Sequence, residues 1–277
     1  MPEKDFGTRL WAAVRGLGPL CVGIDPHAAL LADWGLPDDA SGAERFARTV
    51  VAAVAGTAPV VKPQVAFFER FGAAGYAALE RTLADARAAG LLVLTDAKRG
   101  DIGTTAAAYA QAFLDPAGPL FSDALTVSPY LGFGSLAPFL DAAAAQGCGV
   151  FVLALTSNPE GPQVQHARGP DGRTVAGAVL AEVAARNTGA EPQGSVGVVV
   201  GATIGQTAED LACNGPVLVP GLGAQGGGAA DLRRIFGAVA PHVLPAVSRE
   251  ILRAGPSEGR LRAAAAEAVA AFGAALM

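Results

Sequence analysis

The chain alternates between short apolar runs and longer alanine-rich segments along its whole length. Runs rich in Val, Leu and Ile predict strands buried on both faces, as in a parallel sheet covered by helices. Eight strands are predicted, at residues 19–25, 59–64, 91–96, 123–129, 149–156, 195–202, 216–221 and 242–248. The segments between and after them predict helices near residues 41–56, 72–89, 103–114, 134–146, 174–188, 206–213, 228–239 and 257–275.

Eight strand–helix units in 277 residues favour one (β/α)8 TIM barrel that spans residues 1–277 as a single domain. No Pro/Ser-rich linker or run of charge divides the chain. A doubly wound sheet with a small appendage is the alternative that the same alternation allows.

Polar residues follow the ends of the predicted strands, whereas the strand interiors carry almost no charge. A barrel builds its functional site at the C-terminal ends of its strands, so these residues are the first candidates for function. They are Asp25, Lys62, Asp96, Lys98, Thr156, Ser157, Gln225 and Arg249.

Composition narrows the class of protein. With 51% hydrophobic and 16% charged residues the chain is compact rather than disordered or fibrous, and a net charge of -5 gives no reason to expect nucleic acid or a membrane as partner. The chain starts with charges where a signal peptide needs an apolar region. The apolar end, residues 263–277, is short and interrupted by Glu267, so it predicts a packed helix rather than a membrane span.

Cysteine and lysine are both rare in this chain, and their positions help to predict its environment and its site. Cys21, Cys148 and Cys213 lie far apart in apolar surroundings, which predicts reduced core cysteines and a cytoplasmic protein. Of the 20 basic residues, 17 are Arg and the only lysines are Lys4, Lys62 and Lys98. An internal lysine therefore marks a place where arginine does not serve, since only lysine can give up a proton.

The stretch LTDAKRGDIGTT places four charges directly after an apolar run. Asp96 and Lys98 are two residues apart, so both side chains face the same way if the strand continues through them. Asp101 then falls in the following turn. One interpretation is a salt-bridged helix entrance with Asp101 as N-cap. The other is an alternating Lys, Asp, Lys, Asp array completed by Lys62 at the end of the neighbouring strand.

Such an array has a chemical use. Mutual pairing keeps the lysines protonated and the aspartates ionised. A fixed ammonium group can then stabilise a carbanion as it forms and deliver a proton to it. A carboxylate beside the reacting centre would repel a carboxylate of the substrate.

The motif DAKRGDIGTT, in the pattern DxKxxDIGxT, resembles the orotidine 5'-phosphate decarboxylase family, and most of all its longer bacterial branch. The enzymes of this family convert orotidine 5'-monophosphate to UMP and CO2 in pyrimidine biosynthesis. The other segments that carry the resemblance are VGIDP at Asp25, VKPQVAFFE at Lys62, LTSNPEG at Ser157, PGLGAQGG at Gln225 and VSREIL at Arg249.

The resemblance implies a role for each residue of the array. Lys98 would protonate C6 of the pyrimidine after CO2 leaves, and Asp96 would lie near the departing carboxylate. Lys62 would connect the charged array with the ribose, and Asp25 would bind ribose hydroxyls. The resemblance also implies a homodimer in which Asp101 and Thr105 act in the neighbouring subunit's site, with Thr105 near the ribose.

No metal or organic cofactor is expected. The histidines His27, His166 and His242 have no metal-binding spacing and are predicted to be structural or exposed.

The segment GLGAQG, residues 221–226, formally matches a dinucleotide-binding GxGxxG. It follows the seventh strand rather than the first, and no acidic residue ends the next strand, which argues against that assignment. Barrels often bind phosphate in the loops after strands 7 and 8. Gln225 and Arg249 are therefore predicted to hold phosphate, the alternative for Arg249 being a surface ion pair with Glu250. Many family members flank this arginine with glycine, whereas Ser248 and Glu250 flank it here.

Ser157 resembles the family's serine that contacts the pyrimidine, although Thr156 could take that place and both hydroxyls could instead cap backbone groups. Residues 158–173 are too many for a tight turn and could form a lid over the substrate. Arg99 has no assigned role and is predicted to lie at an interface or on the surface.

Two other functions remain. Mg²⁺-dependent sugar-phosphate decarboxylases and hexulose-phosphate synthases also carry a DxKxxD strand end, but the SNPEG loop and the KPQ setting of Lys62 favour a nucleotide substrate. A non-catalytic phosphate-binding protein would use the array only for structure.

Overall fold

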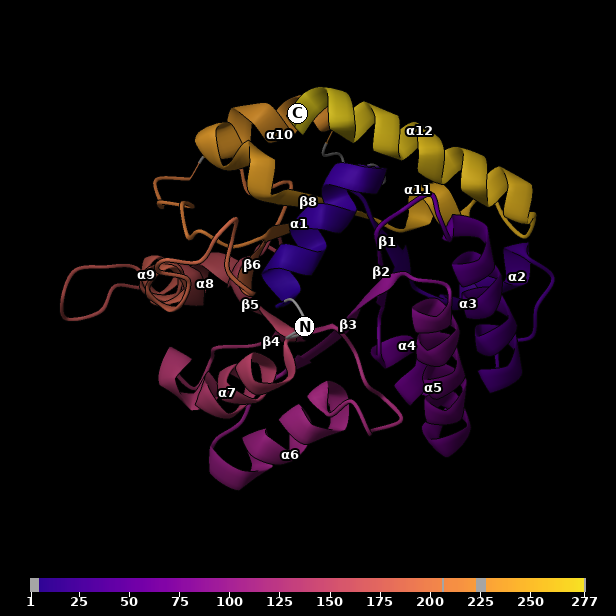
Figure 1. Cartoon of the computed structure of the whole chain (residues 1–277), viewed down its shortest axis with the longest axis horizontal. Coiled ribbons are helices and arrows are strands. Elements are labelled where there is room, and N and C mark those ends of the chain that lie inside the picture. The colour runs from indigo at the N-terminus through magenta and orange to yellow at the C-terminus, as the bar shows by residue number, and fades with distance from the viewer. Residues whose placement is uncertain (1–4, 206, 223–227, 277) are drawn as a thin grey trace.

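The computed structural model describes residues 5–205, 207–222 and 228–276. Its eight parallel strands pair in chain order, and β8 pairs with β1, so the sheet closes into a barrel (Figure 1). The predicted (β/α)8 barrel is confirmed, and closure excludes the doubly wound sheet. The strands are β1 Cys21–Ile24, β2 Val60–Pro63, β3 Leu92–Arg99, β4 Ala124–Val127, β5 Gly149–Leu155, β6 Val196–Val200, β7 Val217–Pro220 and β8 Val243–Val247.

A ring of helices surrounds the barrel (Figure 1). The long helices are α3 Ala40–Val54, α5 Gly72–Ala88, α6 Gly103–Leu114, α7 Ala137–Gln146, α9 Val175–Arg186, α10 Ala229–Phe236 and α12 Glu258–Leu276. Short helices lie in the loops: α2 Ala28–Asp33, α4 Ala66–Glu69, α8 Gly161–Gln165, α11 Arg249–Leu252 and the 3-10 helices η1 Phe133–Leu136 and η2 Gly237–His242.

Apolar spacing and local caps explain these helices. In α3, Phe46, Val50 and Val54 recur every four residues and are fully buried against the sheet. The carboxylate of Asp39 accepts the Gly42 N–H at 2.9 Å and so caps the start of α3. The C-terminal helix α12 packs Leu261, Ala265 and Phe272 inward, as expected. No helix in the described part of the chain has the length and apolarity needed to cross a bilayer.

Helix α1 Phe6–Leu17 lay outside the predicted elements and closes one end of the barrel. Phe6 and Leu10 are buried among the first residues of several strands, and the Phe6 ring meets Phe151 edge to face at 6.0 Å. Figure 1 shows α1 crossing the centre of the barrel. Because α1 fills the N-terminal end, an open cavity has room only at the C-terminal end of the strands.

The predicted helix at residues 206–213 is wrong for the residues described there, 207–213, which form no helix. Side chains satisfy the local backbone instead: Thr207 Oγ1 accepts the Glu209 N–H and Asp210 Oδ1 accepts the Ala212 N–H. Such short bonds compete with helical ones. The helix predicted at 228–239 stops at Phe236, and the chain continues as η2 from Gly237, whose φ of 45° is left-handed.

Candidate active site

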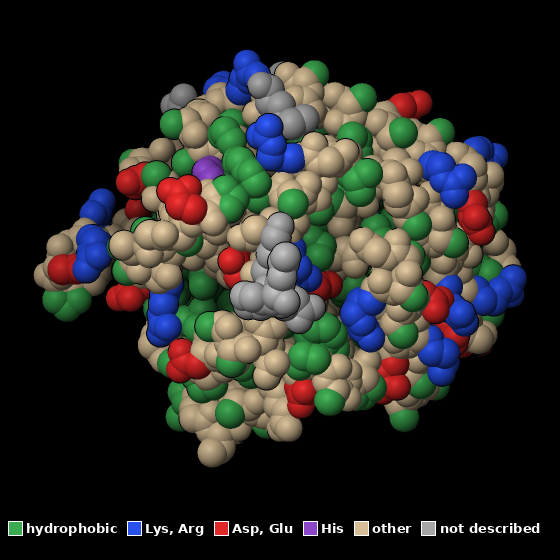
Figure 2. Space-filling view, in the orientation of Figure 1, with side chains coloured by type: hydrophobic (Ala, Val, Ile, Leu, Met, Phe, Trp, Pro, Cys, Tyr) green, Lys and Arg blue, Asp and Glu red, His purple; other side chains and the backbone are tan. Residues whose placement is uncertain are grey.

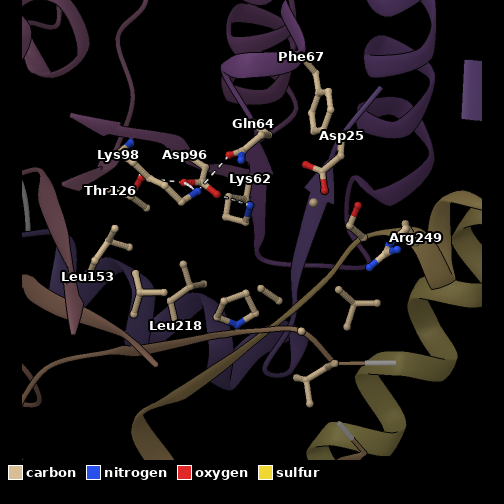
Figure 3. A pocket seen from close by; sticks show the side chains of 18 of the residues that line it. Asp25, Lys62, Gln64, Phe67, Asp96, Lys98, Thr126, Leu153, Leu218 and Arg249 are labelled. Carbon is tan, nitrogen blue, oxygen red and sulfur yellow. Dashed lines mark hydrogen bonds and ion pairs between the residues drawn. The ribbon is translucent and has the colours of Figure 1, made fainter. Parts of the chain in front are cut away.

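A cavity of about 450 Å³ opens at the C-terminal ends of the strands. Figure 3 shows Lys98, Asp96 and Lys62 in a row on one side of it, with Asp25 and Arg249 toward the other. Apolar side chains of strands β5 to β8 form the rest of the wall, which suits a flat organic group. The lining residues are Gly23, Asp25, His27, Lys62, Gln64, Phe67, Asp96, Lys98, Thr126, Leu153, Val199, Leu218, Pro220, Gly221, Leu222, Ala246, Val247, Ser248 and Arg249.

Asp96 is the centre of the charged array. Its Oδ2 lies 2.8 Å from Lys62 Nζ, and its Oδ1 lies 2.6 Å from Lys98 Nζ. Oδ1 also accepts the hydroxyl of Thr126 at 2.8 Å. The side chains of Asp96 and Lys62 are each only 9% exposed, whereas that of Lys98 is 44% exposed. Lys98 is therefore the member of the array that a bound molecule and solvent can both reach.

Asp96 and Lys98 share the cavity because strand β3 is irregular. Thr95 of β3 pairs with Leu125 of β4, and the next pair is Arg99 with Val127. Three residues of β3 therefore lie between these pairs, where β4 has only one. The extra residues on β3 form a bulge, and Lys98 within it has a left-handed φ of 47°. Such a conformation costs about 1 kcal/mol or more for a residue with a side chain, and it is typical of functional sites. The simple alternation expected from the spacing of Asp96 and Lys98 is thus replaced by a bulge.

The array also fixes its own charges. Burial alone would raise the pKa of Asp96, but the ammonium groups of Lys62 and Lys98 outweigh burial and hold that pKa well below its ordinary value. Burial alone would lower the pKa of Lys62, but the Asp96 and Asp25 carboxylates hold it above its ordinary value. Asp96 is therefore ionised and Lys62 protonated across the neutral range.

The opposite wall carries polar atoms that have no partner among the described residues. Asp25 Oδ1 and Ser248 Oγ are both buried and form no hydrogen bond there. Arg249 lines the cavity and makes no ion pair with Glu250, so the surface-pair interpretation is wrong. Buried polar atoms require hydrogen bonds, so this wall is built to meet a polar ligand. Gly23 leaves room for it, since a Cβ there would lie 2.7 Å from Ser248 Cβ.

A sequence model of the family described as "Orotidine 5'-phosphate decarboxylase / HUMPS family" matches residues 18–264. The chain belongs to this family.

Individual relatives within the orotidine 5'-phosphate decarboxylase family match the chain from end to end. The chain is 63% identical over 274 residues to orotidine 5'-phosphate decarboxylase of Salinispora arenicola, with 99% of each chain covered. It is 62% identical over 263 residues to the Streptomyces coelicolor enzyme, with 95% of each covered.

Solved structures agree. A crystal structure described as an orotidine 5'-phosphate decarboxylase of Streptomyces avermitilis is 60% identical, with a TM-score of 0.98 and coverage of 100% of this chain and 97% of that one. Leishmania donovani OMP decarboxylase is 33% identical, with a TM-score of 0.77 and 98% of each chain covered.

Two residues of the family motif lie away from the cavity of their own chain. Asp101 and Thr105 are not among its lining residues, and Thr105 is exposed. Asp101 Oδ1 accepts the N–H of the next residue, Ile102, at 2.8 Å. Helix α6 has Ile102 at its N-cap and no side-chain cap, so Asp101 as N-cap is wrong.

Thr156 and Ser157 line a second cavity of about 430 Å³, between β5 and the loop after β6. The Thr156 hydroxyl donates to Asn158 Oδ1 at 2.7 Å and accepts from Gln165 Nε2 at 2.6 Å. It is therefore occupied within its own loop, whereas Ser157 is exposed and makes no side-chain hydrogen bond within the described residues. Of the two hydroxyls, Ser157 is the one available to a ligand. Gln225 lies outside the described residues.

Arg99 points away from the cavity and joins β3 to the outer helices. It bonds Glu69 at 3.0 Å and the Tyr76 hydroxyl at 3.4 Å, and its guanidinium lies 5.5 Å from the Tyr109 ring centre. Its side chain is 21% exposed, so it is not a freely exposed surface residue, and a role at an interface stays a prediction.

The histidines occupy different environments. His27 lines the cavity, with its ring 4.1 Å from that of Phe67, so it is not simply structural or exposed. His242 bonds Gln193 and contacts Trp11, as a structural residue does. The described residues hold no cluster of three or more His, Cys, Asp or Glu that could bind a metal ion.

All three cysteines are buried and none forms a disulfide, as predicted, and burial raises the pKa of the Cys21 thiol to about 12.

Residues of the cavity that were missed from sequence include Gln64, Phe67 and Thr126. With its amide nitrogen turned to Asp96, Gln64 donates to the backbone oxygen of Asp96 at 2.9 Å and to Oδ2 at 2.7 Å. Gln64 lies in the KPQ segment beside Lys62, at the end of a predicted strand, so the sequence could have indicated it as a cavity residue. Thr126 lies within an apolar strand, where its sequence context marks it only as a β-branched residue.

Proposed function

We propose that the array of Lys62, Asp96 and Lys98 catalyses the decarboxylation of orotidine 5'-monophosphate to UMP and CO2. The reaction itself rests on the comparisons, since relatives matched over 99% of their length at 62–63% identity are orotidine 5'-phosphate decarboxylases. The chain is accordingly a carbon–carbon lyase of UMP biosynthesis. The observation that supports the residue roles is one carboxylate held between two ammonium groups at the edge of an open cavity.

The chemical step needs no redox partner. The bond from C6 to the carboxylate breaks, CO2 leaves, and the electron pair stays on C6. The ammonium of Lys98 stabilises this carbanion as it forms and then transfers a proton to C6, which gives UMP. Lys98 regains a proton from water, which its exposure allows.

Asp96 would lie beside the substrate carboxylate and repel it before CO2 leaves. Its low pKa keeps it ionised for that role.

The remaining cavity residues would hold the ribose and phosphate. Asp25, whose buried Oδ1 has no hydrogen-bond partner among the described residues, accepts hydrogen bonds from ribose hydroxyls, and Lys62 joins the array to the ribose. Arg249, which has no side-chain partner among the described residues, lies at the cavity rim and binds the phosphate together with Gln225. Ser157 contacts the pyrimidine edge, and residues 158–173 close over the substrate as a lid.

The active enzyme is proposed to be a homodimer, with Asp101 and Thr105 completing the partner's site. Large apolar side chains near these residues support this, because they are unusually exposed: Ile102 is 62%, Tyr130 77% and Leu131 54% exposed. We also propose that residues 1–277 form one domain and that the enzyme needs no metal or cofactor. A cytoplasmic location is proposed as well, because the three buried cysteines form no disulfide. On the face in Figure 2, acidic and basic side chains are mixed, which does not favour nucleic acid as a partner.

The test is to add purified protein to orotidine 5'-monophosphate and follow its absorbance, with and without a chelator. We expect rapid loss of substrate that the chelator does not change. Inhibition by the chelator would contradict a metal-free reaction. Failure to consume or bind the nucleotide would favour the Mg²⁺-dependent sugar-phosphate enzymes of the same barrel group. Binding of the nucleotide without turnover would favour the non-catalytic phosphate-binding protein.

A further inference from the structure

We propose that Thr126 is a positioning residue for the reaction, because its hydroxyl holds the Asp96 carboxylate and the Lys98 backbone in one fixed arrangement. The inference rests on the proposed function, since it concerns how Lys98 is aimed at C6. Thr126 lies on β4, outside the charged array, and is only 1% exposed.

The Thr126 hydroxyl makes two hydrogen bonds of opposite sense. Its oxygen accepts the backbone N–H of Lys98 at 3.0 Å, and its proton goes to Asp96 Oδ1 at 2.8 Å. The same Oδ1 receives Lys98 Nζ at 2.6 Å. Asp96, Lys98 and Thr126 therefore form a closed ring of hydrogen bonds, in which the two ends of Lys98 are fixed through one carboxylate oxygen.

This ring explains how the bulge on β3 is maintained. Regular pairing with β4 is interrupted between Thr95 and Arg99, and the backbone N–H of Lys98 finds the Thr126 side chain instead of a ladder carbonyl. Pairing resumes where Ser128 N–H donates to Arg99 O at 2.8 Å. The left-handed φ of Lys98 is unfavourable by itself, so it persists only where the surroundings enforce it. Thr126, on β4, stabilises this conformation through its hydrogen bond to the Lys98 N–H.

The arrangement also specifies which side chain is suitable at position 126. A residue without a hydroxyl leaves the Lys98 N–H and one lone pair of Asp96 Oδ1 without this partner, although Lys62 and Lys98 still neutralise Asp96. The charges of the array then survive while its geometry loosens. A shift of about 1 Å in a reacting group can lower the rate about 100-fold, so such a change should appear in kcat rather than in substrate binding.

The experiment compares Thr126→Val, Thr126→Ala and Thr126→Ser with the parent enzyme. Valine keeps the branched shape of threonine without the hydroxyl, and serine keeps the hydroxyl. Alanine is a second variant without a hydroxyl, in case the valine variant does not fold. We expect valine and alanine to lower kcat about 10- to 100-fold and to change the Kd for UMP by less than about 3-fold. Serine should stay within about 3-fold of the parent in kcat.

Thr95→Val is the matched control. Thr95 is fully buried on β3, and its hydroxyl lies 2.6 Å from that of Ser122, away from the cavity lining. It should lower the midpoint of thermal unfolding and leave kcat unchanged. Thr126→Val and Thr126→Ala with parental kcat would overturn the role of Thr126. So would a fall in UMP binding as large as the fall in kcat, or a serine variant no more active than valine. A parent that does not consume orotidine 5'-monophosphate would overturn the proposed function instead.

Discussion

At the scale of single residues, the buried pair of Lys62 and Asp96 links the site to stability. Asp96 has a lowered pKa, so its contribution is complete above the ordinary carboxyl pKa of 3.8 and is lost as the pH falls below it. Lys62 has a raised pKa, so its contribution is complete below the ordinary lysine pKa of 10.5 and is lost as the pH rises above it. Between these limits the pair should stabilise the fold by a constant amount.

Lys62→Met should therefore destabilise the protein most at neutral pH. Removing one member of a buried pair typically costs 3–5 kcal/mol, and we expect about 2–3 kcal/mol here because Lys98 still pairs with Asp96. Urea unfolding at several pH values would measure it. The difference from the parent should be constant from about pH 5 to pH 9 and shrink outside that window. A difference that grows toward acid pH would contradict this assignment of charges.

Residue chemistry explains why only part of the site could be read from the sequence. Lys62, Asp96 and Lys98 were predictable because charge at the end of an apolar strand is unusual. Thr126 was not, since a threonine inside a strand is ordinary and its partners come from a bulge that spacing does not reveal. Gln225 lies outside the described residues, and its proposed role still rests on the family resemblance.

At the scale of elements, Arg99 secures the end of β3 by linking it to α4, α5 and α6. It bonds Glu69 and Tyr76 on one side and contacts Tyr109 and Phe113 on the other. The strand end that carries Lys98 is therefore tied outward by its next residue while Thr126 holds it from β4.

Arg99→Ala should lower the free energy of unfolding by about 2 kcal/mol, because it removes both the charged bonds and the packing of the long side chain. Arg99→Met keeps the apolar stem and should lose about 1 kcal/mol. Chemical denaturation of both variants would measure this. Equal losses would show that packing of the apolar stem contributes nothing, and no loss in either variant would show that Arg99 does not secure the end of β3.

The elements themselves were largely predictable. Seven of the eight strands fall within the predicted ranges because a barrel strand is apolar on both faces and short, and β3 continues beyond its predicted end at residue 96 to Arg99. The helix at 206–213 failed because side-chain bonds to the backbone favour an irregular loop there, and helix α1 was missed because its partner is the barrel interior, which appears only once the sheet closes.

At the scale of the whole molecule, a shared site should show itself by complementation. Lys98→Ala and Asp101→Ala are each expected to be inactive. In mixed dimers one of the two sites would combine an intact Lys98 with an intact Asp101 from the other subunit. With random exchange of subunits we expect about a quarter of the parental activity.

A mixture of Lys98→Ala and Asp96→Ala is the matched control, because both residues belong to the same chain's site and no mixed dimer restores it. It should stay inactive. Absence of activity in the first mixture, with exchange of subunits verified, would show that each site is complete within one chain.

Steady-state decarboxylation of orotidine 5'-monophosphate by Lys98→Ala and Lys98→Arg, with the Kd for UMP measured on the same samples, tests the central claim most directly. Both variants should bind UMP and fold as the parent does. Alanine should lower kcat at least about 1000-fold, and arginine should not restore it, because a guanidinium keeps its charge but does not release a proton. Activity of either variant within about 10-fold of the parent would contradict proton delivery by Lys98.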